Sequence, residues 1–344
     1  RQLLGQETKF TRTIHAAAAE HPQRVVFAEG EHNTMMKAAV QAKTEGICYP
    51  ILLGNPDRLR RMAARLKLDL TGIELIDMRA DQEQGRRATY AKHLSEKRAR
   101  DGYTFQEAYD KMYERNYFGM MMVETGDADA FITGLYTKYS NTIKVAKEVV
   151  GIREGNSTFG TMHIINSPKG ILYLGDTLVN GDPTTDDLVA IAKLAAHTVD
   201  FFNDTPNIAM ISYSNFGSDK APGSQKVKDA VARLHQEEPE LCVDGEMQIG
   251  CALNRQLRDD LYPFSKLAGK DCNTLVFPNL TSARSAYKLL QMLSNDVEII
   301  GPVQMGLNKP IHFTDSESSV RDVVNITAIA SLDAYVEKIK GGRK

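Results

Sequence analysis

The sequence predicts an α/β fold made of two doubly wound parallel-sheet domains with an interdomain cleft. Three observations lead to this prediction. The chain has 344 residues, which is more than one compact core usually holds. Short apolar runs alternate with amphipathic helical stretches along most of its length. A glycine-rich polar stretch at 151–160 interrupts this alternation and marks a domain boundary.

The first domain is predicted from strands and helices that alternate. A helix at 9–23 precedes a strand at 24–28, a helix at 34–44 and a strand at 47–53. Strand, helix and strand within about 30 residues form a βαβ unit, which requires a parallel sheet. The pattern then predicts a helix at 56–66, a strand at 73–76, a helical region at 81–125 that breaks at 102–104, a strand at 130–133 and a helix at 141–149.

The second domain is predicted to open with two short strands, 162–166 and 171–176, joined by a turn at 167–170. The proline, threonines and aspartates at 182–187 are typical of a helix N-terminus. The remaining pattern predicts strands at 208–211, 241–247, 274–277 and 297–302, and helices at 226–234, 282–293 and 320–339.

The last of these helices is assigned to the first domain. The predicted domains are therefore 1–150 with 320–344, and 151–319. The second domain is expected to carry most of the cleft loops and the dimer interface. Because Arg1 is not a natural start, we expect the chain to have been cut from a longer protein or trimmed to its ordered part, and a missing upstream domain stays an alternative.

Composition argues against several kinds of partner. Basic and acidic residues nearly balance, 42 against 44, so nothing indicates nucleic acid or an anionic membrane. No apolar run approaches the ~20 residues that cross a bilayer, and no signal peptide is visible. The four cysteines share no C-x-x-C spacing and the eight histidines share no metal-ligand spacing. We therefore expect no metal site, reduced thiols and a cytoplasmic location.

The strongest candidate for a binding loop follows the predicted strand at 208–211. Ser214, Asn215 and Ser218 place hydroxyl and amide groups there, and Gly217 lets a backbone N–H approach a ligand. Small polar residues between a strand and a helix suit a phosphate or carbonyl oxygen. An ordinary polar turn is the alternative interpretation. The chain lacks G-x-G-x-x-G after a strand and G-x-x-x-x-G-K-[ST], which disfavours a self-contained dehydrogenase or kinase.

Other loops are expected to line the same cleft, because the carboxyl ends of parallel strands meet at one edge of a sheet. Asp244 and Glu246 alternate along a strand and are predicted to point the same way. They form either a carboxylate pair in the cleft or a structural pair, and we favour the structural interpretation. His312 is the one histidine in a candidate cleft loop. The expected cleft loops, besides 212–218, are 244–246, 278–280 and 301–306.

Five motifs occur in a fixed order: Gly126–Ala130, Ser212–Ser218, Val243–Met247, Phe277–Leu280 and Val320–Ala328. With these motifs the chain resembles the phosphotransacetylase superfamily nearly end to end. It resembles one branch especially, the carboxy-terminal phosphotransacetylase-like domain of multidomain malic enzymes.

The resemblance also shows departures from active transacetylases. Those enzymes usually carry Ser-x-Ser-Thr-Lys-Gly-Ser after the strand, whereas Asn215 and Phe216 replace Thr-Lys here, as in the malic enzymes. They also carry Ser-Arg-Gly before the last helix, where this chain has Asp315, Ser316 and Glu317. A developing oxyanion on acetyl phosphate needs fixed positive charge, so the two acids would repel it.

Other family positions are partly kept. A family arginine is Lys144 here, which keeps the charge but loses the two-pronged geometry. Arg98 matches a family arginine, although a solvated run of basic residues would explain it equally. Asp322 matches the aspartate taken as the family's candidate base. The family-equivalent catalytic positions are thus Arg98, Lys144, Asp315, Ser316 and Asp322. The predicted ligand-binding residues are Ser214, Asn215, Gly217, Ser218, Asn279, Tyr287, Gly306, Arg98 and Asp322.

The resemblance implies a module that binds acetyl-CoA or a related acyl-CoA without efficient acyl transfer. It would be the regulatory and oligomerising part of an NADP-dependent malic enzyme, whose upstream domains would convert malate to pyruvate with NADP and Mg²⁺ or Mn²⁺. The fragment itself would hold no cofactor, form a homodimer or higher homo-oligomer, and take acetyl-CoA as an inhibitor that biases domain closure. Two alternatives remain open, an active phosphate acetyltransferase with Asp322 as base and a ligand-free assembly module.

Overall fold

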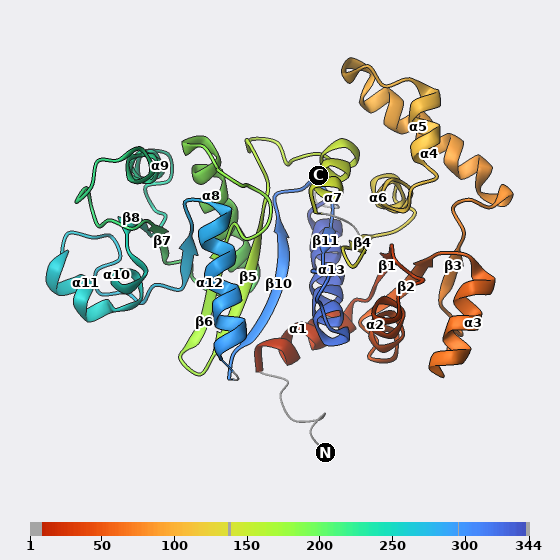
Figure 1. Ribbon diagram of the computed structural model, residues 1–344, viewed down its shortest axis with the longest axis horizontal. Helices are drawn as coiled ribbons and strands as arrows, with labels where there is room; N and C mark the ends of the chain where they lie inside the picture. Colours follow the sequence, from red (N-terminus) through yellow and green to blue (C-terminus); the bar gives the residue numbers. More distant parts are fainter. Residues whose placement is uncertain (1–8, 137–138, 295, 342–344) are drawn as a thin grey trace. The chain divides into compact units, whose positions relative to one another are not determined.

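The computed structural model describes residues 9–136, 139–294 and 296–341. The chain divides into two compact units, Arg1–Gly151 with Leu307–Lys344 and Ile152–Gly306. Each unit is built around one β-sheet with helices packed against it (Figure 1). Within the described residues, no helix combines the length and the apolar character that crossing a bilayer requires. The predicted α/β class is confirmed.

The first unit contains a five-stranded sheet in the order β11-β4-β1-β2-β3, and every neighbouring pair is parallel. Parallel neighbours require crossover connections, which the intervening helices supply. The strands are β1 (Gln23–Phe27), β2 (Cys48–Leu53), β3 (Glu74–Ile76), β4 (Ala130–Thr133) and β11 (Ile311–Phe313).

Local sequence fixes several helix starts in this unit. The side chain of Asn55 accepts hydrogen bonds from the first-turn amides of α3, and Pro56 occupies its first position. Thr104 and Glu107 form a capping box at the start of α5. The helices are α1 (Lys9–Glu20), α2 (Asn33–Thr44), α3 (Pro56–Leu66), α4 (Gln84–Lys97), α5 (Phe105–Lys111), α6 (Arg115–Thr125), α7 (Tyr139–Val149) and α13 (Val320–Gly341).

The second unit contains a six-stranded sheet in the order β10-β5-β6-β9-β7-β8. Its sheet is mixed, since β5 runs antiparallel to both β6 and β10 while the other pairs are parallel. The predicted tight turn between the first two strands explains this, because a turn of a few residues can only join antiparallel strands. The strands are β5 (Gly160–Ser167), β6 (Gly170–Gly175), β7 (Ile208–Ile211), β8 (Val243–Met247), β9 (Thr274–Val276) and β10 (Glu298–Met305).

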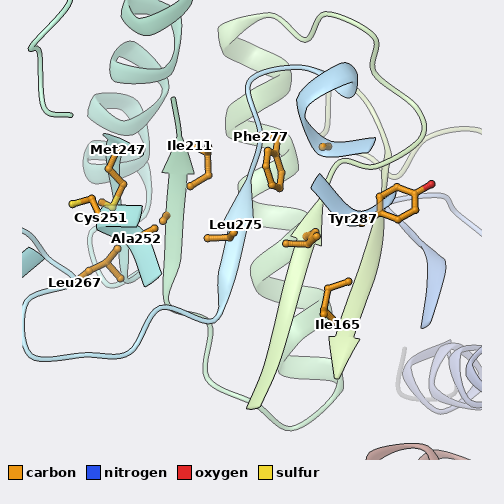
Figure 2. Close-up of a cluster of buried hydrophobic side chains, with 12 residues drawn as sticks. Ile165, Ile211, Met247, Cys251, Ala252, Leu267, Leu275, Phe277 and Tyr287 are labelled. Atoms are coloured by element: carbon orange, nitrogen blue, oxygen red, sulfur yellow. The ribbon is translucent and has the colours of Figure 1, made fainter. Parts of the chain in front are cut away.

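A buried apolar cluster fixes the strand ends of the second sheet (Figure 2). Ile211 at the end of β7, Met247 at the end of β8 and Phe277 just after β9 all belong to it. The loops that follow these strands therefore start from anchored positions. The helices of this unit are α8 (Thr185–Phe201), α9 (Pro222–Glu237), α10 (Ile249–Leu253), α11 (Arg255–Leu261) and α12 (Leu280–Leu293). The sequence pattern did not predict the short helices α10 and α11.

The boundary predicted at 319/320 is wrong by 13 residues, because the chain returns to the first unit at Leu307. Strand β11 pairs in parallel with β4, with His312 opposite Ile132. A strand of three residues is too short for an apolar pattern to be recognised in the sequence. The expectation that His312 lies in a cleft loop is also wrong. Its side chain is buried within β11, and Nε2 lies 3.0 Å from Oδ2 of Asp333 in α13.

Candidate functional site

The candidate site lies at the carboxyl edge of the second sheet. Strands β9, β7 and β8 are adjacent and parallel, so the loops after them leave the sheet side by side. This brings together three of the predicted stretches, 212–218, 244–246 and 278–280, although 244–246 lies within β8 rather than in a loop and residue 280 already begins α12. The fourth, 301–306, is not a loop as expected, because residues 301–305 belong to β10, and β5 and β6 separate β10 from β9.

Glu246 at the end of β8 organises the loop after β7. Its side chain is buried, and Oε1 accepts hydrogen bonds from the backbone N–H of Gly217 at 2.6 Å and from Oγ of Ser214 at 3.2 Å. Its own carbonyl oxygen accepts the N–H of Phe216 at 2.8 Å. The Gly217 N–H, predicted to approach a ligand, is therefore directed to a carboxylate of the protein instead.

Three buried hydroxyl groups lie beside this carboxylate. Oγ of Ser214 is 2.9 Å from Oγ of Ser224 in the first turn of α9, and Oγ of Ser212 is 3.3 Å from each of these two oxygens. Hydroxyl groups both donate and accept, so each of the three can serve its neighbours. Sequence analysis missed Ser224, since a serine in the second position after a helix proline gives no functional signal of its own.

The outer part of the loop is a tight turn. Asn215 donates its N–H to Oγ of Ser218 at 3.0 Å, and Ser218 returns its N–H to the carbonyl of Asn215 at 3.0 Å. Oδ1 of Asn215 accepts the N–H of Gln248 at 2.8 Å, which ties the turn to the loop after β8. Ser218 is exposed and Asn215 is partly exposed, so these two predicted residues face outward more than Ser214 does.

Phe216 turns its ring toward other aromatic rings. The ring centroids of Tyr262 and Phe264 lie 4.7 and 5.0 Å away. Aromatic pairs at such distances are favourable beyond the area they bury. Phe216 thus anchors the loop through apolar contacts.

Asp244 does not share a site with Glu246. The pairing register of β7 and β8 shifts between Met210 and Ile211, so the two carboxylates are out of strict alternation. Oδ2 of Asp244 accepts hydrogen bonds from Oγ of Ser265 and from the N–H of Lys266, both at 2.8 Å. Both carboxylates thus accept hydrogen bonds from the protein, but at separate places, so they do not form the single pair that either interpretation assumed.

Asn279, Tyr287 and Gly306 each have a structural task. Oδ1 of Asn279 caps α12 by accepting the N–H of Ser282 at 2.9 Å. The buried ring of Tyr287 stacks on His163 at 4.1 Å. Gly306 has a φ of +95°, which disfavours any residue with a Cβ atom, and a Cβ there would lie 2.8 Å from the Leu194 side chain, which would have to move. Gly306 directly follows β10, and β5, β6 and β9 separate β10 from β7 in the sheet.

In the first unit, Arg98 is not part of a solvated charge run. It ends α4, and its guanidinium reaches the carboxyl end of α7. Nε donates to the carbonyl of Glu148 at 2.7 Å, and Nη2 donates to the carbonyl of Lys147. A cation at this point satisfies carbonyls that a helix end leaves unpaired and complements the helix dipole.

Lys144 is largely exposed and lies 3.7 Å from Oε1 of Glu148, one helical turn further on. Partial burial tends to raise the pKa of Glu148, but hydrogen bonds from Tyr103 and Tyr117 and nearby lysines lower it overall. Glu148 is therefore an anion at neutral pH. The positive charge of Lys144 is partly balanced within its own helix.

Residues 315–322 form the entry to α13. Oδ1 of Asp315 accepts the Ser316 hydroxyl at 3.3 Å and the Glu317 N–H at 3.4 Å, so this stretch folds as a turn around its own carboxylate. Oδ2 of Asp322 accepts both the N–H and the hydroxyl of Ser319 at 2.8 Å, which is a capping box. The proposed base thus has a helix-capping task. No group of His, Cys, Asp or Glu side chains among the described residues could hold a metal ion.

Comparisons with known proteins converge on one family. A family model described as Phosphate acetyl/butaryl transferase matches residues 9–331. The NADP-dependent malic enzyme of Salmonella typhimurium is 35% identical over 326 residues, covering 94% of this chain and 43% of that protein. The phosphate acetyltransferase of Corynebacterium glutamicum is 31% identical over 321 residues, covering 93% of this chain and 96% of that protein. The chain thus spans less than half of the malic enzyme and nearly all of the acetyltransferase.

A solved structure supports the same comparison. The phosphotransacetylase from Streptococcus pyogenes aligns with a TM-score of 0.85 at 29% identity, covering 94% of this chain and 99% of that one. Coverage of this extent includes most of both units.

Proposed function

The chain belongs to the phosphate acetyl/butaryl transferase family, and from this premise we propose that it binds acetyl-CoA or a related acyl-CoA without efficient acyl transfer. It would act as the regulatory and oligomerising part of an NADP-dependent malic enzyme, with acetyl-CoA as the inhibitor. Malate oxidation, NADP and the divalent metal would belong to parts outside this chain. The similarity to malic enzymes over 43% of their length supports this assignment.

The observation that carries the proposal is the turn at 315–317. Asp315, Ser316 and Glu317 stand where active relatives are expected to place a serine, an arginine and a glycine, and Asp315 holds the turn together. A phosphoryl or acyl transition state is stabilised by donors and cations already in place before the reaction. Acids held at that position would oppose the charge that develops, whereas binding of the ligand elsewhere need not involve them.

The other cationic positions in the first unit support the same conclusion. Arg98 donates to the carbonyls at the end of α7, and Lys144 lies beside Glu148. Both cations have acceptors within the protein, so we propose that neither serves mainly to bind an anionic ligand. In the second unit, the loop of Ser214 keeps its shape through Glu246 and still exposes Ser218 and Tyr213. We propose that this loop contacts the acyl-CoA.

Association of the chain is part of the proposal. Helix α12 leaves Leu289, Met292 and Leu293 exposed, at 61, 79 and 77% of their surface. Clustered apolar side chains of this size on one helix end favour contact with another protein surface. We propose that α12 contributes to a homo-oligomeric interface of the second unit.

A second candidate is an active phosphate acetyltransferase, which the near-complete coverage of the Corynebacterium enzyme favours. In that reaction, the CoA thiol would lose its proton to Asp322 and attack the acyl carbon of acetyl phosphate, and phosphate would leave. The loss of positive charge near Asp315 argues against this candidate.

The test is calorimetric titration of the chain with acetyl-CoA, followed in the same sample by a phosphate-dependent acetyl-transfer assay. Binding with turnover well below about 1 per second supports the regulatory proposal. Turnover on the order of 1 to 10³ per second would establish the acetyltransferase instead. If the titration releases no heat at millimolar acetyl-CoA, an assembly module is the one interpretation that remains.

A further inference from the structure

The two carboxylate oxygens of Glu246 have different surroundings. Oε1 accepts the Gly217 N–H at 2.6 Å and the Ser214 hydroxyl at 3.2 Å. Oε2 is buried and accepts no hydrogen bond from any residue that the structure describes. Buried polar atoms usually find partners, so Oε2 of Glu246 is an exception among the buried oxygens around this loop. All the interactions of the side chain with the loop pass through Oε1.

The loop that Oε1 holds has a conformation that needs support. Phe216 has a φ of +45° and Gly217 a φ of +84°. A residue with a Cβ atom, such as phenylalanine, adopts the left-handed region only where its surroundings hold it there. Glu246 supplies two of the restraints, since its carbonyl accepts the Phe216 N–H while its side chain accepts the Gly217 N–H.

We propose that Glu246 is a positioning residue whose Oε1 fixes residues 214–217 in the conformation that receives the acyl-CoA. The residue does not touch the ligand itself, because it is buried beneath the loop. It acts by holding the Gly217 amide and the Ser214 hydroxyl in place. The part that concerns the ligand rests on the proposed function, whereas the part that concerns the loop does not.

The chain offers matched variants that separate geometry from charge. Glu246→Gln keeps an acceptor oxygen at the position of Oε1 and places its amide group at the idle Oε2 position. Glu246→Asp keeps the charge but withdraws the acceptor by one methylene. Asp244→Asn is the control, because Asp244 is a buried carboxylate of the same strand that serves Ser265 and Lys266 rather than the loop.

The experiment measures amide hydrogen exchange of the whole chain without ligand, resolved at Gly217. We expect Glu246→Asp to speed exchange at Gly217 at least tenfold, and both Glu246→Gln and the control Asp244→Asn to leave exchange at Gly217 within threefold of the parent. Unchanged protection of Gly217 in Glu246→Asp, or the reverse order of the two Glu246 variants, would overturn the proposal. If Glu246→Asp does not fold, Glu246→Gln still tests the proposal, because rapid exchange at Gly217 in Glu246→Gln would also overturn it.

A second measurement titrates the same variants with acetyl-CoA. We expect at least tenfold weaker binding for Glu246→Asp and an affinity within threefold of the parent for Glu246→Gln. Equal affinities in all variants, together with a loosened loop, would overturn the role in ligand binding. If the parent chain itself binds no acetyl-CoA, the proposed function fails, while the exchange data still decide whether Glu246 positions the loop.

Discussion

Arg24 and Asp129 form a two-pronged ion pair at the amino ends of β1 and β4. Nη2 lies 3.0 Å from Oδ1, and Nε lies 3.2 Å from Oδ2. Arg24 also donates to the carbonyls of Gly126 and Asp127, and Lys338 of α13 approaches Asp129 at 3.0 Å. The motif 126–130, which helped to relate the chain to its family, is therefore a structural clamp that joins neighbouring strands.

This clamp predicts a stability loss that depends on pH. Burial acts to raise the pKa of Asp129, but the hydrogen bonds from Arg24 and Lys338 outweigh it and lower the pKa. A depressed carboxyl pKa stabilises the fold above the pKa of the unfolded chain, and this contribution disappears as the pH falls through the folded-state pKa. Asp129→Asn should therefore lower the free energy of unfolding by roughly 1–3 kcal/mol at neutral pH.

Denaturant unfolding at a series of pH values measures this effect. The difference between Asp129→Asn and the parent should shrink as the pH falls below the range in which ordinary aspartates titrate. The exposed pair Arg60 and Asp57 provides a control, and Asp57→Asn should cost little at any pH. If the difference in unfolding free energy between Asp129→Asn and the parent stays constant across the acid range, the lowered pKa of Asp129 does not contribute to stability as assigned.

Substitutions at Asn279 should affect the stability of the chain and its affinity for acyl-CoA separately. Asn279→Ala removes the cap of α12 and should cost about 1 kcal/mol of stability, whereas Asn279→Asp keeps an acceptor for the Ser282 N–H. If Asn279 also contacts acyl-CoA, both variants should bind it more weakly, because aspartate repels the phosphates of the ligand. Thermal unfolding and acetyl-CoA titration distinguish these effects. Parent-like affinity in Asn279→Asp would restrict Asn279 to its capping task.

Ser214→Ala should weaken acyl-CoA binding through the loop. The hydroxyl belongs to the buried cluster with Ser224 and also donates toward Glu246. Its loss leaves buried partners unsatisfied, which typically costs 1–3 kcal/mol. Titration of Ser214→Ala and of Ser218→Ala with acetyl-CoA tests this. Parent-like affinity in both variants would remove this loop from the binding site.

Restoring positive charge before α13 should raise any trace of transferase activity. The double variant Asp315→Ser with Ser316→Arg replaces an acid and supplies the arginine that active relatives are expected to carry. Ser316→Arg alone keeps Asp315 as a neighbour that can neutralise the new cation, so it should have a smaller effect. The phosphate-dependent transfer assay compares the two. If the double variant has no more activity than the parent, the deficit lies elsewhere, with Lys144 and Phe216 the first positions to change.

Self-association should depend on the exposed end of α12. Leu293→Lys with Met292→Lys places charges on the most exposed apolar positions of the helix and should shift the chain to a smaller species in sedimentation velocity at micromolar concentration. Lysine replacements at exposed polar positions, such as Gln106 and Gln256, serve as controls. Assembly unaffected by the α12 changes would place the interface on another surface.

The sequence alone determined the class of fold, the order of nearly all its strands and long helices, and the family. Short apolar runs identify β1 and β7, because parallel strands covered by helices are buried on both faces, and a repeat of about 3.6 residues identifies α3. Capping residues such as Thr184 fix a helix start through contacts within four residues, which a linear pattern can show. Family motifs survive in sequence for the same reason, since each is a short contiguous stretch.

The tertiary structure decided what depends on partners far apart in the chain. The assignment of β11 to the first sheet follows from its pairing with β4, some 180 residues earlier, and three residues carry no periodicity. The tasks of Arg98, Asp129 and Glu246 depend on acceptors and donors in other elements, which no local pattern specifies. Hydrogen bonds act over about 3 Å of space whatever the separation in sequence, so only the folded chain shows which polar groups meet.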